Sequence, residues 1–263
     1  MEEQATPLFV EERKRKIMEM LSVQSKLYVS KLCKEFGVSP VTIRSDLQEL
    51  EQAGLLQRTH GGAIPVSKAS YEPTSHAKEI SHMEEKKRIA AKAAELVEPG
   101  DTICLDTGTT IYELAKQLTG KRNLNVITND LQIAMYLEEN LEDCSLIVLG
   151  GTIRRGFHCT VGPIALSSIK NLNVDKAFMA ANACTLEKGF TTPSIEQAEV
   201  KRALMSIASQ SIMLVDSSKF GQVSMAGFAR IDDMDKLITD KGLHPGTRSA
   251  LQSACETMEL ILV

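Results

Sequence analysis

The fold of the N-terminal region is decided by residues 36–64, which read FGVSPVTIRSDLQELEQAGLLQRTHGGAI. Gly37 suits the end of a helix, because glycine adopts a positive φ without steric cost. Ser39 can cap the following helix, and Pro40 fits its first turn, where a missing N–H costs nothing. This helix is predicted to run to Ala53. Its inner face carries Ile43, Leu47 and Leu50, and its outer face carries Val41, Arg44, Ser45 and Gln48.

Two further helices are predicted upstream of this stretch. Ile17 and Leu21, four residues apart, indicate a short amphipathic helix between Val10 and Leu21. A second helix is predicted from an apolar stripe at Val29, Leu32, Cys33 and Phe36. Two short helices joined by a tight turn that contains glycine are typical of a helix-turn-helix.

Residues 55–64 read as two short strands around a turn, which is a β-wing placed directly after the second helix of the motif. In a helix-turn-helix that second helix lies in the major groove of DNA. Arg44 can read a guanine or clamp a phosphate, and His60 can reach the backbone or make no contact at all. The alternative is a helical bundle that binds protein. The predicted DNA-binding residues are Ser39, Pro40, Val41, Thr42, Arg44, Ser45, Gln48, Arg58 and His60.

The charge of the chain is unevenly distributed. The net charge is −4, yet residues 13–64 hold nine Lys and Arg against five Asp and Glu. A basic segment fused to an acidic remainder is expected when only one part approaches phosphates. The region from Arg13 to Ile64 resembles the DeoR family of repressors, most clearly in FGVS (36–39), TIRSDL (42–47) and HGGA (60–63).

The second part of the chain alternates between strand and helix signals. We predict a DNA-binding domain over 1–64, a linker over 65–82 and an α/β sensor domain with a mostly parallel sheet over 83–263. Strands buried on both sides are predicted at 102–105, 125–128, 145–149, 177–180, 212–215 and 259–263. Helices are predicted at 84–97, 110–119, 130–140, 163–172, 194–210 and 246–256.

Polar residues follow most of these predicted strands. Ligands bind beyond the carboxyl ends of strands in such sheets, and glycine and hydroxyl residues at a helix start offer N–H groups to anions. Glycines after the third strand would let the chain approach a ligand closely. The residues predicted to bind an effector at this edge are Asp106, Thr107, Gly108, Thr109, Thr110, Thr128, Asn129, Asp130, Gly150, Gly151, Arg154, Asn182, Asp216 and Lys219.

The same segments are similar to the sensor domain of the DeoR family, whose fold is similar to ribose-5-phosphate isomerase and coenzyme A transferases. The resemblance implies a repressor of a carbohydrate-utilisation operon that responds to a phosphorylated sugar. Many relatives carry a Gly-Ala-Asp-Gly-like stretch after the residue equivalent to Phe178, where this chain has Met179 to Cys184 with Asn182 inside it. The identity of the sugar therefore does not carry over.

Two other functions remain possible on the sequence. An aldose–ketose isomerase needs a general base, for which Asp106, Asp130 and Asp216 are candidates, although capping a helix explains each of them equally well. Fusion to a DNA reader favours a sensor over an enzyme, since turnover would destroy the signal. The third possibility is a protein-interaction scaffold with two degenerate modules.

The remaining expectations concern partners and location. We expect operator DNA, a phosphorylated sugar and further copies of the chain (a dimer or tetramer) as partners, and no cofactor and no metal. The acidic start and the lack of a long apolar stretch predict a cytoplasmic protein without a membrane span. The six scattered cysteines predict free thiols and no disulfide.

Overall fold

The computed structural model describes residues 9–23, 26–65, 72, 75, 78, 81–254 and 257–263. Residues 9–65 belong to one compact unit, and residues 82–254 and 257–263 belong to another. The predicted domain limits at residues 64 and 83 stay a prediction, because most of the intervening segment lies outside the described residues.

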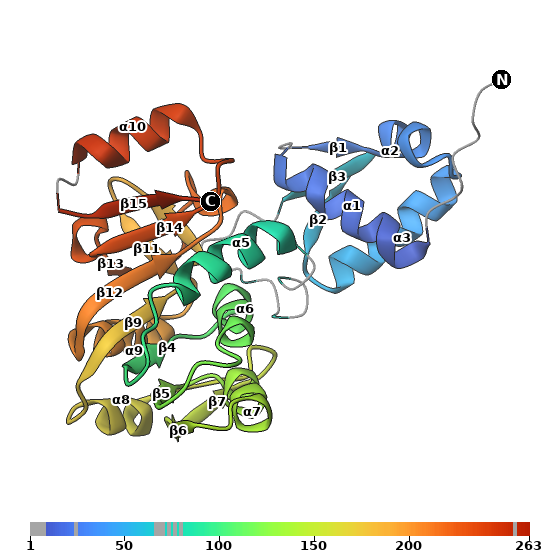
Figure 1. Ribbon diagram of the computed structural model, residues 1–263. Coiled ribbons are helices and arrows are strands. Elements are labelled where there is room, and N and C mark those ends of the chain that lie inside the picture. Colours follow the sequence, from blue (N-terminus) through green and yellow to red (C-terminus); the bar gives the residue numbers. More distant parts are fainter. Residues whose placement is uncertain are drawn as a thin grey trace. The chain divides into compact units, whose positions relative to one another are not determined.

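The N-terminal unit is a winged helix-turn-helix, as predicted (Figure 1). Its side chains Ile17, Leu32, Ile43 and Leu47 are at most 1% exposed and form one core. The unit consists of α1 (Val10–Val23), β1 (Leu27–Tyr28), α2 (Val29–Phe36), α3 (Pro40–Gln52), β2 (Leu56–Thr59) and β3 (Gly62–Pro65).

The sequence did not predict β1, which extends the wing to three antiparallel strands in the order β1-β3-β2. The strand has two residues, which is too short to show an alternating pattern. Gly62 of β3 makes the pairing possible, because a Cβ atom at this position would lie 1.9 Å from the carbonyl oxygen of Leu27.

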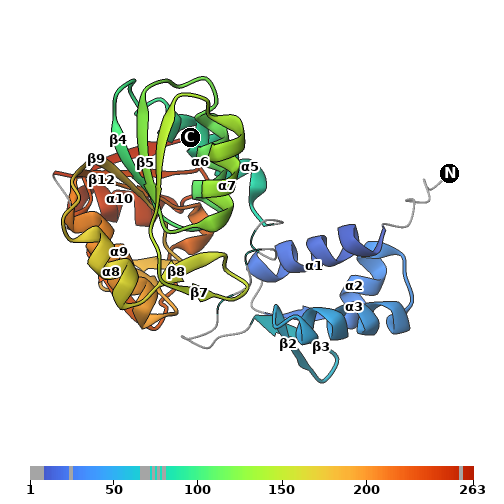
Figure 2. The ribbon, with the colours of Figure 1, turned by 90° about the horizontal axis from the view of Figure 1, so that it is seen from below.

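The larger unit is built on a seven-stranded sheet in which every neighbouring pair is parallel (Figures 1 and 2). Across the sheet the strands are β15 (Glu259–Leu262), β14 (Lys236–Thr239), β12 (Ala208–Leu214), β9 (Val174–Met179), β4 (Thr102–Leu105), β5 (Leu124–Thr128) and β6 (Cys144–Val148). The predicted α/β class with a parallel sheet is thus confirmed.

Helices cover both faces of this sheet. One face packs against α5 (Met83–Ala94), α6 (Thr109–Gln117) and α7 (Leu131–Asn140). The other face packs against α8 (Pro163–Ile169), α9 (Ile195–Ser206) and α10 (Pro245–Ala254). Figure 2 shows α8 and α9 on the opposite side of the sheet from α6 and α7.

The larger unit also contains several shorter elements outside the seven-stranded sheet. A three-stranded sheet in the order β10-β11-β13 contains β10 (Ala183–Thr185), β11 (Gly189–Thr192) and β13 (Ala226–Ala229). A hairpin joins β7 (Thr152–Arg154) to β8 (Cys159–Val161), and two 3₁₀ turns are η1 (Ser217–Lys219) and η2 (Ile231–Asp233). The sequence predicted none of these elements, nor β14.

Three predictions about the larger unit are wrong. The strands near 145–149 and 259–263 were expected to be buried on both sides, but β6 and β15 are the two edge strands of the sheet. Ile147 of β6 is 43% exposed, and β15 has no buried residue. The helix expected over 194–210 ends at Ser206, because residues 208–210 begin β12 and pair with β9. These differences arise from tertiary pairing, which overrides local propensity.

Candidate functional site

The outer face of α3 is open to solvent. Ser39 caps the helix by accepting a hydrogen bond from the N–H of Thr42 at 3.1 Å, and Gly37 ends α2 with a φ of 64°. Val41, in the first turn of the helix, is 73% exposed and is therefore accessible to a partner. Of the predicted DNA-binding residues of this helix, Thr42 is half-buried, and Ser39, Pro40, Val41, Arg44, Ser45 and Gln48 are exposed.

A buried ion pair fixes the inner face of α3 to α1. Arg13 Nε and a terminal guanidinium nitrogen of Arg13 donate to the two carboxylate oxygens of Asp46, at 2.5 and 2.9 Å. The sequence did not predict this pair. Asp46 lies three residues after Ile43 and four before Leu50, so helical periodicity places it on the inner face. The pair holds α3 in a fixed position on the unit.

The two predicted wing residues have different surroundings. The backbone N–H of Arg58 donates to Glu51 Oε1 at 2.8 Å, and the Arg58 guanidinium lies 3.9 Å from Glu51 Oε2. This arrangement ties the wing to the end of α3. His60 lies in the exposed turn between β2 and β3. Both side chains keep solvent-exposed surface, so their predicted contact with DNA stays a prediction.

In the larger unit, the carboxyl ends of all seven strands meet at one edge of the sheet, since the strands are parallel. The order of the strands along the chain reverses between β4 and β9, and ligands bind in such sheets at this switch point. Asp106 follows β4 there and is fully buried. Asp106 Oδ2 accepts the N–H of Ala180, which follows β9, at 3.0 Å.

Lys201 of α9 completes the switch point. Its ammonium group forms a buried ion pair with Asp106 and donates to the carbonyl oxygen of Ala180 at 2.9 Å. The Lys201 side chain is 3% exposed. One lysine therefore joins the ends of two strands that are neighbours in the sheet but 74 residues apart in sequence.

The end of β5 is joined to the end of β4. Thr107 Oγ1 donates to Asp130 Oδ2 at 2.7 Å, and Asp130 Oδ1 caps α7 by accepting the N–H groups of Gln132 and Ile133. Burial raises the pKa of Asp130, while the hydrogen bond from Thr107 and those from backbone N–H groups act in the opposite direction. Asn129 Nδ2 donates to the carbonyl oxygen of Thr160 in β8 at 2.9 Å.

Of the predicted residues that follow β6, Gly151 packs closely against the β7–β8 hairpin. Gly151 has a φ of 141°, and a Cβ atom there would lie 2.6 Å from the carbonyl oxygen of Val161. The close approach that requires this glycine is thus made by the β7–β8 hairpin. Gly150 is exposed. Arg154 lies over the ring of Phe157, 4.3 Å from its centroid, and pairs with Cys159 across the hairpin.

A second group of charges lies at the end of β12. Asp216 is 1% exposed and accepts the N–H of Ser218 at 3.1 Å, and Lys219 Nζ lies 3.8 Å from its Oδ2. Burial acts to raise the pKa of Asp216, but Lys219, Ser218, His82 and Lys86 together hold it below its usual value. Asp216 is therefore an anion surrounded by cations. Lys86 of α5, which is 2% exposed, was not among the predicted residues.

The remaining predicted residues lie on neighbouring loops. Asn182 Oδ1 accepts the hydroxyl of Thr192 at 3.0 Å, beside the small sheet. Gly108, with a φ of 128°, precedes the first turn of α6, which holds Thr109 and Thr110. Thr128 is fully buried, and its hydroxyl accepts the N–H of Asp130 at 3.0 Å.

Buried polar atoms at this edge are left without hydrogen-bond partners. Within the described part of the chain, the set includes Asp106 Oδ1, Asn129 Oδ1, Gln197 Nε2 and Asp216 Oδ2. Such atoms are rare in folded proteins and call for a ligand or a water. Asp106, Asn129 and Asp216 follow strands, and Gln197 lies in the first turn of α9. The edge can therefore bind a ligand rich in hydroxyl groups or carrying negative charge.

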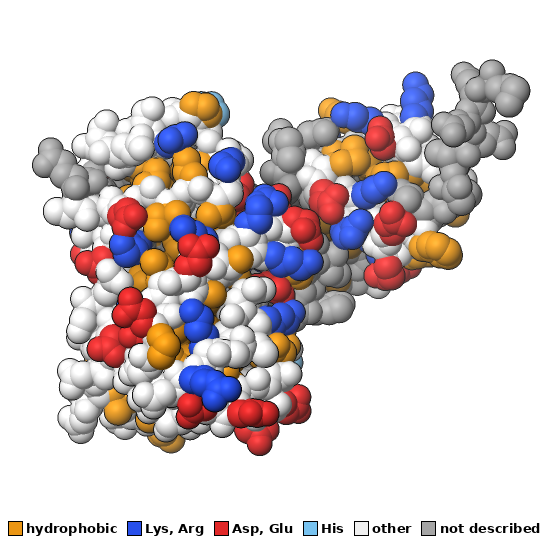
Figure 3. Space-filling model, viewed as in Figure 1, with side chains coloured by type: hydrophobic (Ala, Val, Ile, Leu, Met, Phe, Trp, Pro, Cys, Tyr) orange, Lys and Arg blue, Asp and Glu red, His pale blue; other side chains and the backbone are white. Residues whose placement is uncertain are grey.

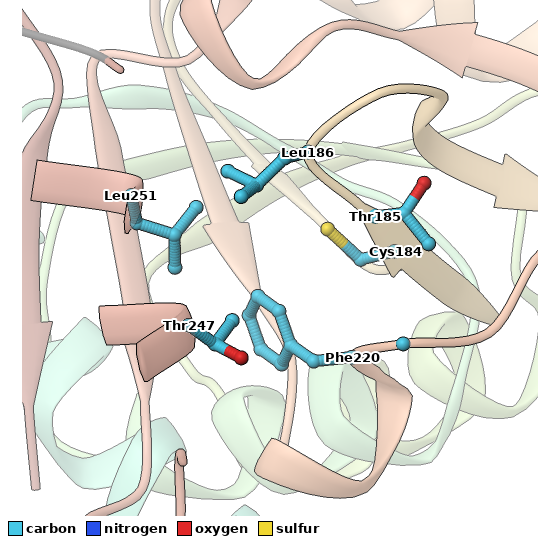
Figure 4. A pocket seen from close by; sticks show the side chains of 7 residues that line it. Cys184, Thr185, Leu186, Phe220, Thr247 and Leu251 are labelled. Atoms are coloured by element: carbon cyan, nitrogen blue, oxygen red, sulfur yellow. The ribbon is translucent and has the colours of Figure 1, made fainter. Parts of the chain in front are cut away.

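A small cavity lies apart from the predicted residues (Figure 4). It has a volume of about 160 Å³ and is lined by Cys184, Thr185, Leu186, Phe220, Gly221, Thr247 and Leu251. Burial raises the pKa of the Cys184 thiol to about 12, so this thiol is uncharged. The cavity is mostly apolar and offers no cation to an anionic ligand.

Acidic and basic side chains of the larger unit are interspersed on the face that Figure 3 shows. Among the described residues, no group of three or more His, Cys, Asp and Glu side chains is placed to hold a metal ion. No helix in the described ranges is long and apolar enough to span a membrane.

A winged helix-turn-helix followed by an α/β domain with a polar strand-end edge defines a class, the DNA-binding transcriptional regulators with a separate sensor domain. Two family models match the chain: the DeoR-like helix-turn-helix domain over residues 13–69 and the DeoR C terminal sensor domain over residues 81–241. The chain belongs to the DeoR family.

Curated relatives support this assignment over nearly the whole chain. It is 37% identical to HTH-type transcriptional regulator GlpR of Haloferax volcanii, covering 94% of this chain and 96% of that protein. It is 36% identical to transcriptional repressor AccR of Agrobacterium fabrum (94% and 95%) and 35% identical to the lactose phosphotransferase system repressor of Lactococcus lactis (89% and 92%). All three are named as regulators, and this chain is a regulator rather than an enzyme.

A solved structure with a partly similar fold is ribose 5-phosphate isomerase A from Methanocaldococcus jannaschii. The TM-score is 0.40 and the identity 18%, covering 53% of this chain and 55% of that chain. A likeness of this size supports no conclusion about function.

Proposed function

We propose that this chain is a cytoplasmic repressor of a carbohydrate-utilisation operon, and that a phosphorylated sugar controls its affinity for operator DNA. Two of the relatives above are named repressors, one of them of a lactose phosphotransferase system. The predicted DNA-binding residues of α3 are solvent-accessible, and N-terminal residues of a recognition helix contact base edges.

The observation that carries the sensor part of this proposal is the polar strand-end edge. Lys219, with a side chain 28% exposed, can meet a phosphate, and the N–H groups at the start of α6 can add to its binding. The unpartnered oxygens of Asp106 and Asn129 can accept the hydroxyl protons of a sugar. A ligand that carries both a phosphate and several hydroxyl groups is a phosphorylated sugar.

A ligand can control DNA binding only if it binds two states of the protein with different affinities. We propose that the chain acts as a dimer or tetramer, which places two recognition helices on half-sites separated by whole helical turns. The ligand then favours the arrangement that does not fit the operator. This mechanism predicts induction by the sugar, the usual sense in the family that the chain resembles.

Arg44→Ala is expected to weaken binding to the operator by about 1–3 kcal/mol, roughly 5- to 150-fold, because one contact to a base or phosphate is lost. Fluorescence anisotropy on a labelled duplex from upstream of the adjacent operon measures this affinity. Arg15→Ala in α1, whose guanidinium lies 3.5 Å from Glu19, is the matched control and should bind DNA as the wild type does.

The same titration, repeated with sugar phosphates present, tests the sensor part. At least one of them should release the wild-type protein from the duplex, and Arg44→Ala should bind that compound with wild-type affinity in a thermal-shift assay. If Arg44→Ala binds the duplex as tightly as the wild type, α3 is not the DNA-reading element. If no sugar phosphate releases the wild type, the sensor proposal fails.

A further inference from the structure

Two polar side chains, Gln197 and Lys201, are buried on the inner face of α9. Gln197 and Lys201 are both 2% exposed and are four residues apart, so they lie on the same face of the helix. Ser194 caps α9 by accepting the N–H of Gln197 at 3.2 Å. The cap fixes the first turn and with it the position of the Gln197 side chain.

Gln197 lies in the same cluster as the ends of β4 and β5. Its Oε1 accepts a hydrogen bond from Cys159 Sγ at 3.5 Å. Cys159 in turn lies close to Thr107, Asp130 and Lys201, whose dipoles and charges act on its thiol. Gln197 Nε2 is left without a partner among the described residues. Gln197 thus carries a buried amide donor without a partner, next to the Cys159 thiol.

An unpartnered acceptor lies at the end of β4, where Asp106 pairs with Lys201 of the same helix. Lys201 holds Asp106 through Oδ2, and the N–H of Ala180 donates to this oxygen as well. Asp106 Oδ1 is buried and has no partner within the described chain. The lysine therefore fixes the orientation of the carboxylate while one oxygen stays available. The pair at the switch point consists of one open donor and one open acceptor.

We propose that Gln197 and Asp106 together recognise a single hydroxyl group of the ligand, and that Lys201 positions Asp106 for this contact. The Gln197 amide donates to the hydroxyl oxygen, and Asp106 Oδ1 accepts the hydroxyl proton. This inference rests on the proposed function of the edge as the sugar-phosphate site, and it adds a residue that determines specificity.

The contact selects for a particular chemical group. A hydroxyl both accepts and donates, whereas a carbonyl cannot donate to Asp106 and a methylene satisfies neither partner. A site that leaves buried polar groups unpaired rejects such analogues strongly. The ligand is therefore a phosphorylated sugar or alditol with a hydroxyl, and neither a keto group nor a deoxy carbon, at this position.

The test compares Gln197→Leu with the wild type in the full chain. Operator release is titrated with ribose 5-phosphate, glucose 6-phosphate, galactose 6-phosphate and sorbitol 6-phosphate, each beside analogues that lack one hydroxyl. Gln117→Leu, which replaces an exposed glutamine at the end of α6, is the matched control. The Tm of each variant is measured without ligand.

For a compound that releases the wild type, Gln197→Leu should raise the half-release concentration at least about tenfold. One deoxy analogue should be much weaker than its parent on the wild type, and this preference should fall to within about twofold in Gln197→Leu. The Tm without ligand should fall little, because the variant removes a buried donor that has no partner and loses only the weak hydrogen bond from the Cys159 thiol. Gln117→Leu should change none of the three.

Two results for Gln197→Leu would overturn the inference while the proposed function survives. In the first, the compounds that release the wild type also release the variant, with the same preference for the parent over its deoxy analogue. In the second, the Tm of the variant is clearly lowered, as expected for a residue with a purely structural role. A wild type that none of the compounds releases contradicts the proposed function, and the inference falls with it.

Discussion

Lys201→Met is expected to lower the free energy of unfolding of the larger unit by about 3–5 kcal/mol, because it leaves the Asp106 carboxylate buried and without its cation. The side chains of the pair are 3% and 0% exposed, so water cannot replace the lost partner. Methionine fills a similar volume, which separates the loss of charge from the loss of packing. Thermal and urea unfolding of the full chain, followed by circular dichroism, measure the effect.

The double variant Lys201→Met with Asp106→Asn provides the control. It removes both charges and keeps an acceptor for the N–H of Ala180, so it should be more stable than Lys201→Met alone. A Lys201→Met protein within 1 kcal/mol of the wild type would show that this ion pair is not buried as described.

Asp46→Ala is expected to unfold the N-terminal unit under conditions where the larger unit stays folded. The substitution leaves the Arg13 guanidinium buried, with a side chain 6% exposed and no counter-charge, at a cost of about 3–5 kcal/mol. Small domains bury a smaller share of their surface on folding than large ones and are less stable, so a loss of this size removes most of their stability. Binding to the operator should disappear together with the fold.

Ligand binding by the larger unit shows whether the substitution affects the N-terminal unit alone. Thermal shifts of Asp46→Ala with a sugar phosphate should match those of the wild type, and adding Arg13→Met should restore part of the lost helical signal. Operator affinity unchanged in Asp46→Ala would refute the claim that this pair holds α3 in place.

Apart from β1, the elements of the N-terminal unit could be predicted because each carries a local signal. The caps at Ser39 and Pro40 and the glycine after Phe36 mark the helix ends, and the apolar stripes follow a period of 3.6. In the larger unit β4 was predicted with its observed limits. By contrast, β14 was not predicted although it is as long as β4. Which strand forms the edge depends on sheet order, which no local pattern contains.

The candidate site was predictable where its residues follow strands. Asp106, Asn129, Asp130 and Asp216 all stand directly after apolar runs, and parallel pairing brings such positions to one edge. Lys86, Gln197 and Lys201 escaped notice, because a polar residue within a helix looks the same whether it faces water or the core. The apolar positions Ala198, Val200 and Leu204 give the phase of α9, and with this phase Gln197 and Lys201 could have been placed inside.

The coupling between the strand-end edge and DNA binding is measured by a reciprocal titration of operator and sugar phosphate. A sugar phosphate should weaken operator binding by some factor, and the operator should weaken binding of that sugar phosphate by the same factor. In Lys219→Ala both factors should fall toward one, while the affinity for the operator without ligand should equal that of the wild type. If the wild type binds the two ligands independently, the strand-end edge does not control DNA binding.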